Sequence, residues 1–196
     1  MKKGVLLIMA KTPRIGAVKT RLARDIGVLK AWQFYRTSLA RTARRLHGAG
    51  NWETWIQLTP DRDLRPARRW PPSTGLLTQG PGGIGERMQR GLTAVPHGVP
   101  AVLIGSDIPG VTPAHIRRAF DALKHSDAVF GPARDGGYWL VGFANRRSIR
   151  TPFKDVRWSS KHALYDTIAN FAHRRIALVD ALQDVDDGDA YKLLTQ

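Results

Sequence analysis

The sequence contains no cysteine, so neither a disulfide bond nor a thiolate zinc site can form. Long hydrophobic runs are also missing: the apolar segment 4–10 is bounded by Lys3 and Lys11, whereas a membrane-spanning helix needs about 20 apolar residues. No small-residue cleavage site follows that segment, which argues against a signal peptide. We therefore expect a soluble cytoplasmic protein without a membrane partner, and 196 residues fit a single domain, 1–196.

Acidic side chains are scarce. The chain has 16 Asp and Glu against 31 Lys and Arg, which gives a formal net charge of +15. A charge of this size suits either a nucleic-acid partner or an anionic substrate. The cations are spread along the chain, and no helix-turn-helix, zinc-finger or aromatic-rich RNA-binding signature is present. We therefore interpret most arginines as solvated surface residues and do not expect a nucleic-acid partner.

Apolar runs of strand length alternate with segments of helical character along the chain. We expect strands at 4–10, 52–59, 75–79, 101–106, 127–131, 138–143 and 175–180, and helices near 29–47, 83–95, 113–124, 159–173 and 187–195. This alternation predicts an α/β fold with a mostly parallel sheet and helices on both faces, and 127–143 is a candidate antiparallel insertion. The segment 61–74, rich in Arg and Pro, is interpreted as a mobile surface loop.

The first expected strand leads into a positively charged loop at 11–22. The loop contains Pro13 and Gly16 together with the cations Lys11, Arg14, Lys19 and Arg21. Backbone N–H groups and cations at the end of a strand form an anion site, and phosphate is the expected ligand. The loop matches neither the Walker A spacing nor Gly-x-Gly-x-x-Gly. The alternative is an ordinary solvated basic turn.

An aspartate, Asp107, stands at the carboxyl end of the apolar strand 101–106. Ligands of open α/β sheets gather at the carboxyl ends of strands, so this carboxylate is positioned to meet a substrate or a metal ion. The alternative role is that of a helix cap or turn former. Thr112 followed by Pro113 already provides an N-cap and a first helical residue, which leaves Asp107 free for metal binding.

Several motifs occur in order along the chain, and together they resemble a known family. They are Lys11-Thr12-Pro13-Arg14, Lys19-Thr20-Arg21-Leu22, Gln79 with Ile84-Gly85-Glu86-Arg87-Met88, Gly105-Ser106-Asp107-Ile108-Pro109, Gly131-Pro132-Ala133-Arg134-Asp135-Gly136-Gly137-Tyr138, Trp158-Ser159 and Asp184-Val185-Asp186. The set resembles the nucleotide-diphospho-sugar transferase-like proteins, an arsenosugar-biosynthesis-type glycosyltransferase family with radical-SAM neighbours. The Lys-Thr-Arg-Leu loop is also similar to that of 2-phospholactate guanylyltransferase. The resemblance extends from residue 5 to about residue 194.

This resemblance implies a GT-A fold that binds a nucleotide over the first loop, with Mg²⁺ or Mn²⁺ bridging its phosphates. Asp107 corresponds to the metal-binding aspartate of the family. Gly110 stands where many relatives carry a second acid, and Asp186 is the best substitute in this chain. The alternative for Asp186 is an acidic cap of the last helix, a role that Asp187 alone can fill.

The expected roles of the other motif residues follow from their charge and from the resemblance. Nucleotide or phosphate binding is expected of Lys11, Arg14, Lys19, Thr20, Arg21, Gln79 and Gly85, and catalysis of Lys19, Arg21 and Asp135. The glycines after Asp135 predict a hairpin turn, from which Asp135 or Tyr138 faces the acceptor. Trp158 is expected to be a packed aromatic residue and Ser159 a helix cap.

The predicted function is metal-dependent transfer from an activated nucleotide donor to a small-molecule acceptor. Glycosyl transfer from a nucleotide sugar is favoured. Nucleotidyl transfer to a phosphorylated small molecule, with release of pyrophosphate, is the alternative enzymatic reaction. A non-catalytic protein that binds nucleotide or nucleic acid is the alternative outside the enzymes.

Overall fold

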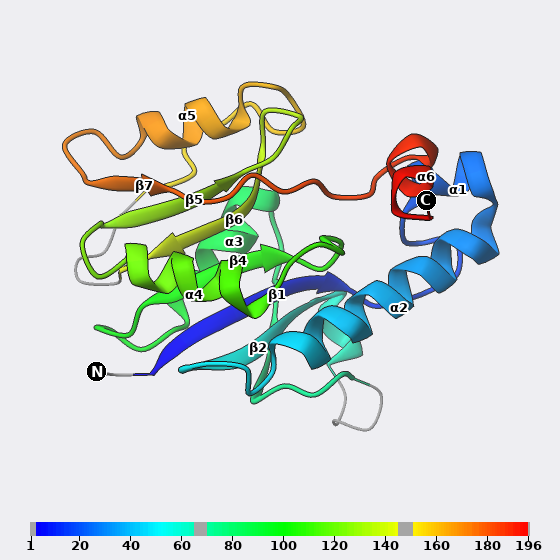
Figure 1. Ribbon diagram of the computed structural model, residues 1–196, viewed down its shortest axis with the longest axis horizontal. Coiled ribbons are helices and arrows are strands. Elements are labelled where there is room, and N and C mark those ends of the chain that lie inside the picture. The colour runs from blue at the N-terminus through cyan, green and yellow to red at the C-terminus, as the bar shows by residue number, and fades with distance from the viewer. Residues whose placement is uncertain (1–2, 65–69, 145–150, 196) are drawn as a thin grey trace.

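The structure is a computed structural model that describes residues 3–64, 70–144 and 151–195 (Figure 1). Its centre is a seven-stranded sheet with the order β3-β2-β1-β4-β6-β5-β7. The strands are β1 (Gly4–Lys11), β2 (Trp52–Thr59), β3 (Gly75–Thr78), β4 (Ala101–Gly105), β5 (Ala128–Pro132), β6 (Tyr138–Phe143) and β7 (Ile176–Leu178). The helices are α1 (Thr20–Ile26), α2 (Val28–Leu46), α3 (Ile84–Thr93), α4 (Pro113–Ala122), α5 (Ala163–Ala169), α6 (Gly188–Thr195) and the 3-10 helix η1 (Asp61–Asp63).

Most neighbouring strands run parallel, as the alternation of strands and helices predicted. β1 is parallel to β2 and β4, β2 to β3, and β5 to β7. β6 is the exception, because it runs antiparallel to both β4 and β5. The α/β fold and the antiparallel insertion expected within 127–143 are therefore confirmed, and the insertion is β6.

Helices cover both faces of the sheet, and successive residues of the interior strand β1 point to opposite faces. Leu6 belongs to one buried cluster, which includes Leu39 of α2 and Ile116 of α4. Leu7 belongs to the other cluster, which includes Met88 of α3. Figure 1 shows α4 in front of the sheet and α3 behind it. The sheet is thus a packed, two-sided platform, and the side chains that follow its strand ends are held in fixed positions.

Two local expectations are wrong. The loop expected at 11–22 ends early, because α1 begins at Thr20 and buries Leu22. The helix expected at 159–173 is confined to α5, and His162 rather than Ser159 occupies its N-cap position. The reason is visible in the backbone: Ser159 and His173 have φ values of 56° and 66°, which an α-helix does not allow.

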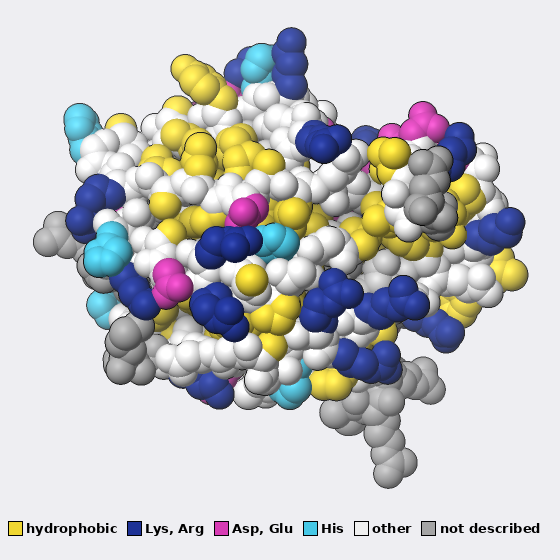
Figure 2. All heavy atoms as spheres, viewed as in Figure 1, with side chains coloured by type: hydrophobic (Ala, Val, Ile, Leu, Met, Phe, Trp, Pro, Cys, Tyr) yellow, Lys and Arg dark blue, Asp and Glu magenta, His cyan; other side chains and the backbone are white. Residues whose placement is uncertain are grey.

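Positive side chains are spread over the face shown in Figure 2, with neutral and hydrophobic surface between them. Within the described part of the chain, no helix is long and apolar enough to cross a membrane. Part of the expected mobile loop at 61–74, namely residues 65–69, lies outside the described residues.

Candidate functional site

A pocket of about 620 Å³ opens at the sheet edge where β1 and β4 end and β6 begins. The starts of α1 and α3, the segment that precedes α5 and the segment that precedes α6 complete its wall. This volume lies within the range of known small-molecule sites. The residues predicted from the sequence that line it are Lys11, Lys19, Thr20, Arg21, Gln79, Asp107, Asp135 and Asp186.

Two of the predicted ligand-binding residues make other contacts and are not among the residues that line this pocket. The Arg14 guanidinium forms an ion pair with Asp63 of η1. Gly85 packs beneath the indole of Trp158, because a Cβ atom at this glycine would lie only 2.8 Å from Trp158 Cζ2. Arg14 therefore ties the basic loop to η1, and Gly85 allows an aromatic residue of the pocket wall to approach α3.

The ammonium of Lys19 lies between two carboxylates at the centre of the pocket. Its Nζ donates to Asp107 Oδ2 at 2.5 Å and to Asp186 Oδ1 at 2.5 Å. The Lys19 side chain is only 6% exposed, against 26% for Asp107 and 47% for Asp186. Burial alone lowers the pKa of Lys19, but the two negative charges outweigh it and raise that pKa above its ordinary value. Asp107 Oδ2 and Asp186 Oδ1 thus both contact the ammonium nitrogen of Lys19.

This pair of oxygens suits a hard divalent cation that draws its other ligands from phosphate and water. Mg²⁺ is commonly held by only one or two carboxylates together with substrate phosphates. Among the described residues, no group of three or more His, Asp or Glu side chains could hold a metal ion by itself. The donor set therefore fits a cation that arrives with a phosphorylated ligand better than a site built entirely of protein groups.

Local capping interactions explain why Asp107 and Asp186 are free to face the pocket. Thr112 is the N-cap residue of α4, and its backbone N–H donates to His115 Nδ1 at 3.1 Å. Asp187 Oδ1 accepts from the backbone N–H of Ala190 at 2.9 Å and so caps α6. Thr112 and Asp187 thus occupy the N-cap positions of α4 and α6, as expected from the sequence.

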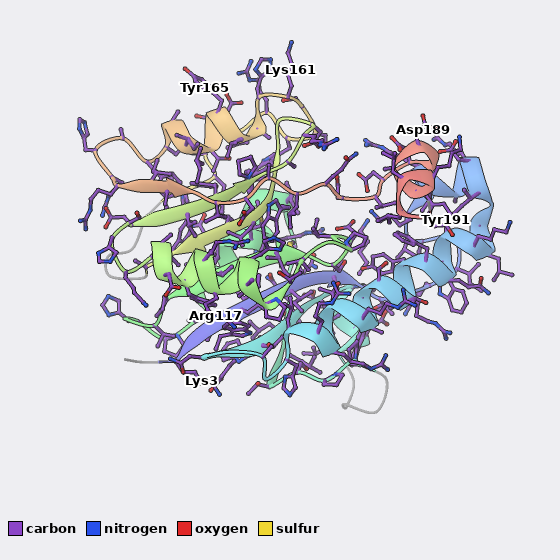
Figure 3. All side chains as sticks on the ribbon, in the orientation of Figure 1. Lys3, Arg117, Lys161, Tyr165, Asp189 and Tyr191 are labelled. Atoms are coloured by element: carbon purple, nitrogen blue, oxygen red, sulfur yellow. The ribbon has the colours of Figure 1, made fainter. Side chains whose placement is uncertain are left out.

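The segment that carries Asp186 is anchored at both ends. Before it, the backbone N–H of Val185 donates to the carbonyl of Asp107 at 3.4 Å. After it, the backbone N–H of Gly188 donates to Asp25 Oδ2 of α1 at 2.8 Å. Tyr191, labelled on α6 in Figure 3, packs edge-on against Phe34 of α2 with ring centroids 5.4 Å apart. These contacts hold Asp186 opposite the end of β4.

Asp184, to which the sequence motifs assign no role, contributes a third carboxylate to the pocket. Burial, and then the charges of Asp186 and Asp107, raise its pKa to about 6. The sequence carries no signal for this effect, because an aspartate in an acidic run normally remains solvated. The pocket thus contains a further acidic group near Lys19, in addition to Asp107 and Asp186, which contact it.

Replacing Asp184 by asparagine should change how stability depends on pH. The folded pKa of Asp184 lies above the reference value of 3.8, so its stabilising contribution is full below about pH 4 and is lost as pH rises through about 6. In EDTA, Asp184→Asn should match the wild type near pH 4 and exceed its free energy of unfolding by roughly 1–2 kcal/mol at about pH 7, after allowance for solvent screening. Urea titrations at both pH values measure this, and a difference that does not vary with pH would contradict it.

Tyr35 of α2 fastens the ends of β1 and β4 to each other. Its hydroxyl oxygen accepts from the backbone N–H of Lys11 at 2.7 Å and from Ser106 Oγ at 3.2 Å, and it donates to the carbonyl of Lys11 at 3.1 Å. Burial raises the pKa of this phenol to about 12, so it stays protonated. The sequence pattern indicates only a core aromatic residue at this helical position.

Tyr35→Phe should therefore destabilise the protein by about 1–3 kcal/mol, because the backbone N–H and carbonyl of Lys11 lose their partner. Tyr165→Phe is the matched control, since that side chain is 74% exposed and projects from α5 in Figure 3. The control should change the free energy of unfolding by less than about 0.5 kcal/mol. Equal urea midpoints for the two variants would refute the proposed role of Tyr35.

The other side of the pocket is aromatic and polar. The rings of Tyr138 and Trp158 lie 6.4 Å apart at their centroids, so Trp158 is packed as expected and also borders the pocket. The expected hairpin is confirmed: the backbone N–H of Ala133 donates to the carbonyl of Gly137 at 3.0 Å. Asp135 is exposed on this hairpin turn and accepts from the backbone N–H of Gly137 at 2.9 Å.

Gln79 lines the pocket and is held in place by hydrogen bonds to the sheet. It is 3% exposed, and its amide nitrogen donates to the carbonyls of Ala10 at 2.9 Å and Gln57 at 3.0 Å. Its amide nitrogen is therefore committed to β1 and β2.

Comparisons with known proteins complete the description of the site. Residues 42–160 match the model of a family described as "Uncharacterized protein conserved in bacteria (DUF2064)". A crystal structure from Desulfovibrio desulfuricans G20, whose protein is provisionally assigned as a nucleotide-diphospho-sugar transferase, is 30% identical, covers 95% of this chain and 84% of that chain, and has a TM-score of 0.86. No curated protein matches the chain.

Two more distant structures share the fold alone. Rv0371c from Mycobacterium tuberculosis H37Rv, solved in complex with manganese, is 18% identical over 98% of this chain and 97% of that chain, with a TM-score of 0.53. The 4-diphosphocytidyl-2C-methyl-D-erythritol synthase of Anaerococcus prevotii is 12% identical over the whole of both chains, with a TM-score of 0.59.

Proposed function

The chain belongs to the DUF2064 family of bacterial proteins, and we propose that it is a divalent-cation-dependent transferase that uses an activated nucleotide. Glycosyl transfer from a nucleotide sugar to a hydroxyl group is the reaction that we favour. The observation that carries this proposal is that Asp107 and Asp186 both contact the ammonium of Lys19, beside a basic loop at the carboxyl ends of β1 and β4. The provisional assignment of the 30% identical relative supports the donor class.

The donor would lie with its diphosphate beside the start of α1. Asp107 and Asp186 would hold Mg²⁺ or Mn²⁺, which would neutralise charge on the diphosphate as the bond to the transferred group breaks. Lys11 and Arg21 also line the pocket, and their charges would stabilise the departing nucleoside diphosphate. The manganese complex of Rv0371c makes Mn²⁺ a reasonable first cation for experiments, although that protein shares only the fold.

The acceptor would lie against the hairpin turn and the segment that precedes α5. The described residues of this wall that line the pocket include Asp135, Tyr138, Trp158, Ser159 and Ser160, and none is Lys or Arg. A phosphorylated acceptor calls for cationic partners, whereas a hydroxyl acceptor calls for a base. This wall therefore favours a hydroxyl acceptor, and hence glycosyl transfer.

In this reaction, Asp135 would take the proton of the acceptor hydroxyl as that oxygen bonds to the anomeric carbon of the donor. The bond between the anomeric carbon and the diphosphate oxygen breaks, and the nucleoside diphosphate leaves with the electron pair. No covalent bond to the protein is needed. The contribution of the chain is to hold the two substrates in position and to provide charges opposite to those that develop.

Nucleotidyl transfer is the second candidate, and the basic loop is the observation that favours it. Lys11, Lys19 and Arg21 all line the pocket, and three cations suit the additional charge of a triphosphate. The two reactions differ in their products, because nucleotidyl transfer releases pyrophosphate and glycosyl transfer releases a nucleoside diphosphate.

Product analysis tests the proposed function. Panels of UDP-, GDP-, CDP- and ADP-sugars and of the four nucleoside triphosphates are incubated with Mn²⁺ or EDTA and a mixture of polyols and sugar phosphates. Release of a nucleoside diphosphate from a nucleotide sugar, abolished by EDTA, is the expected result. Pyrophosphate released from a triphosphate would select the second candidate. Cation-dependent nucleotide binding without either product would indicate a non-catalytic nucleotide-binding protein.

A further inference from the structure

Lys19 is the most constrained cation of the pocket. Its ammonium is bound by both members of the carboxylate pair, and its side chain is nearly inaccessible to solvent. Lys11 and Arg21 line the same pocket, but neither is in an ion pair within the described part of the chain. Lys19 is therefore the cation whose present position coincides with the place where a divalent ion would sit.

The backbone of Lys19 is also unusual. It has φ 48° and ψ 47°, a left-handed conformation that is unfavourable for residues other than glycine. Lys19 is the N-cap residue of α1, and its carbonyl accepts from the backbone N–H of Ala23 at 2.8 Å. The ion pairs to Asp107 and Asp186 thus accompany a strained backbone, and they join the starts of α1 and α6 to the end of β4.

We propose that the Lys19 ammonium competes with the divalent cation for Asp107 and Asp186, so that the protein takes up the cation only together with a phosphate-bearing nucleotide. This inference rests on the proposed function, because it presumes that the carboxylate pair is the cation site. It adds a rule of binding: neither the cation nor the nucleotide binds well alone, and each raises the affinity for the other.

The competition follows from charge and burial. An ammonium and a divalent cation cannot share the point between the two carboxylates, because like charges at contact distance repel strongly. A cation that enters alone would displace Lys19 and separate a poorly solvated ammonium from the two carboxylates that contact it, which is costly. A nucleotide phosphate gives the displaced Lys19 a new partner. Binding of the two ligands is therefore coupled, and the coupling is reciprocal.

Mn²⁺ binding to the nucleotide-free protein tests the proposal, because free Mn²⁺ can be measured by electron paramagnetic resonance without any assay of activity. Wild type, Lys19→Met and Lys11→Met are titrated with MnCl₂. Methionine keeps an unbranched stem in both variants and removes the same single charge. Thermal unfolding of each variant confirms that it is folded, and Lys19→Gln replaces Lys19→Met if the latter is not.

We expect the Lys19 variant to bind Mn²⁺ at least about tenfold more tightly than the wild type, and Lys11→Met to differ from the wild type by less than about threefold. If Mn²⁺ affinity is unchanged in the Lys19 variant, or rises equally in Lys11→Met, the proposal is wrong. Cooperative binding in the wild type could also arise if the nucleotide simply supplied additional ligands to Mn²⁺. In that case the nucleotide-free Lys19 variant would not bind Mn²⁺ more tightly than the wild type, so the comparison separates this explanation from competition by Lys19.

A second titration distinguishes failure of this inference from failure of the proposed function. Wild-type protein is titrated with MnCl₂ in the presence of UDP, GDP, CDP or ADP. If none of them promotes Mn²⁺ binding, the proposed function fails, whatever the Lys19 variant does. If one of them promotes binding while the nucleotide-free Lys19 variant gains nothing, the proposed function stands and only the competition by Lys19 is refuted.

Discussion

Asp107→Asn is expected to lower the affinity for a nucleoside diphosphate in the presence of Mn²⁺ by at least about 100-fold and to abolish turnover. The change removes the negative charge from one of the two oxygens that converge on Lys19. The fold should survive, because Asp107 follows β4 rather than lying within it, is 26% exposed on its side chain, and leaves Lys19 paired with Asp186. Isothermal titration with and without Mn²⁺ measures the effect.

Asp121→Asn is the matched control for this variant. Asp121 lies on the last turn of α4 and pairs with the exposed Lys124, so the same loss of charge occurs outside the pocket. The control should bind nucleotide as the wild type does. The assignment of Asp107 to the cation would be untenable if Asp107→Asn retained the full Mn²⁺ dependence of nucleotide binding.

Gly136→Ala is expected to reduce the free energy of unfolding by at least about 3 kcal/mol. Gly136 turns the β5–β6 hairpin with φ +85°, and a Cβ atom there would lie 2.3 Å from the carbonyl oxygen and 2.5 Å from the Cα of Lys161. Both atoms belong to the backbone and cannot rotate away. The carbonyl of Gly136 also accepts from the backbone N–H of Leu164 at 3.0 Å, which joins the hairpin to α5.

Gly136→Ala combines the backbone strain of a positive φ with a steric clash, and Gly16→Ala measures the strain alone. Gly16 has φ +78°, but a Cβ atom there would meet no atom within 4 Å, so only the backbone strain of about 1–2 kcal/mol applies. Urea unfolding of both variants gives the comparison. A Gly136 variant too unstable to show a folded baseline would agree with the expectation. Equal destabilisation of the two variants would show that the backbone at residue 161 moves away from the new Cβ atom at little cost in free energy.

The mostly parallel sheet could be predicted from the sequence because apolar runs of strand length alternate with helical segments, whereas the order of its strands was not predicted. The antiparallel strand β6 was also predictable, since Asp135-Gly136 is a strong hairpin signal. The short helix α1 was not. It has only 7 residues and follows directly on a left-handed Lys19, so its hydrophobic spacing covers too few turns to be recognised.

The candidate site was predictable to the extent that strand ends and helix caps determine it. Thr112 and Asp187 occupy N-cap positions as expected, and Asp107 and Asp186 line the same pocket. The role of Tyr35 depends on contacts with Lys11 and Ser106 that are 24 and 71 residues away in the sequence. Long-range contacts of this kind leave no local pattern. For the same reason, the bridging position of Lys19 could be found only from the fold.

The measurement that bears most closely on the proposed site is calorimetric titration of the wild-type protein with UDP, GDP, CDP and ADP, each with Mn²⁺ and with EDTA, alongside the corresponding nucleosides. We predict that at least one nucleoside diphosphate binds in the presence of Mn²⁺, that EDTA weakens its binding by at least about 100-fold, and that its nucleoside binds weakly under both conditions. Nucleoside diphosphate binding that is equally strong in EDTA would contradict the assignment of Asp107 and Asp186 to a divalent cation.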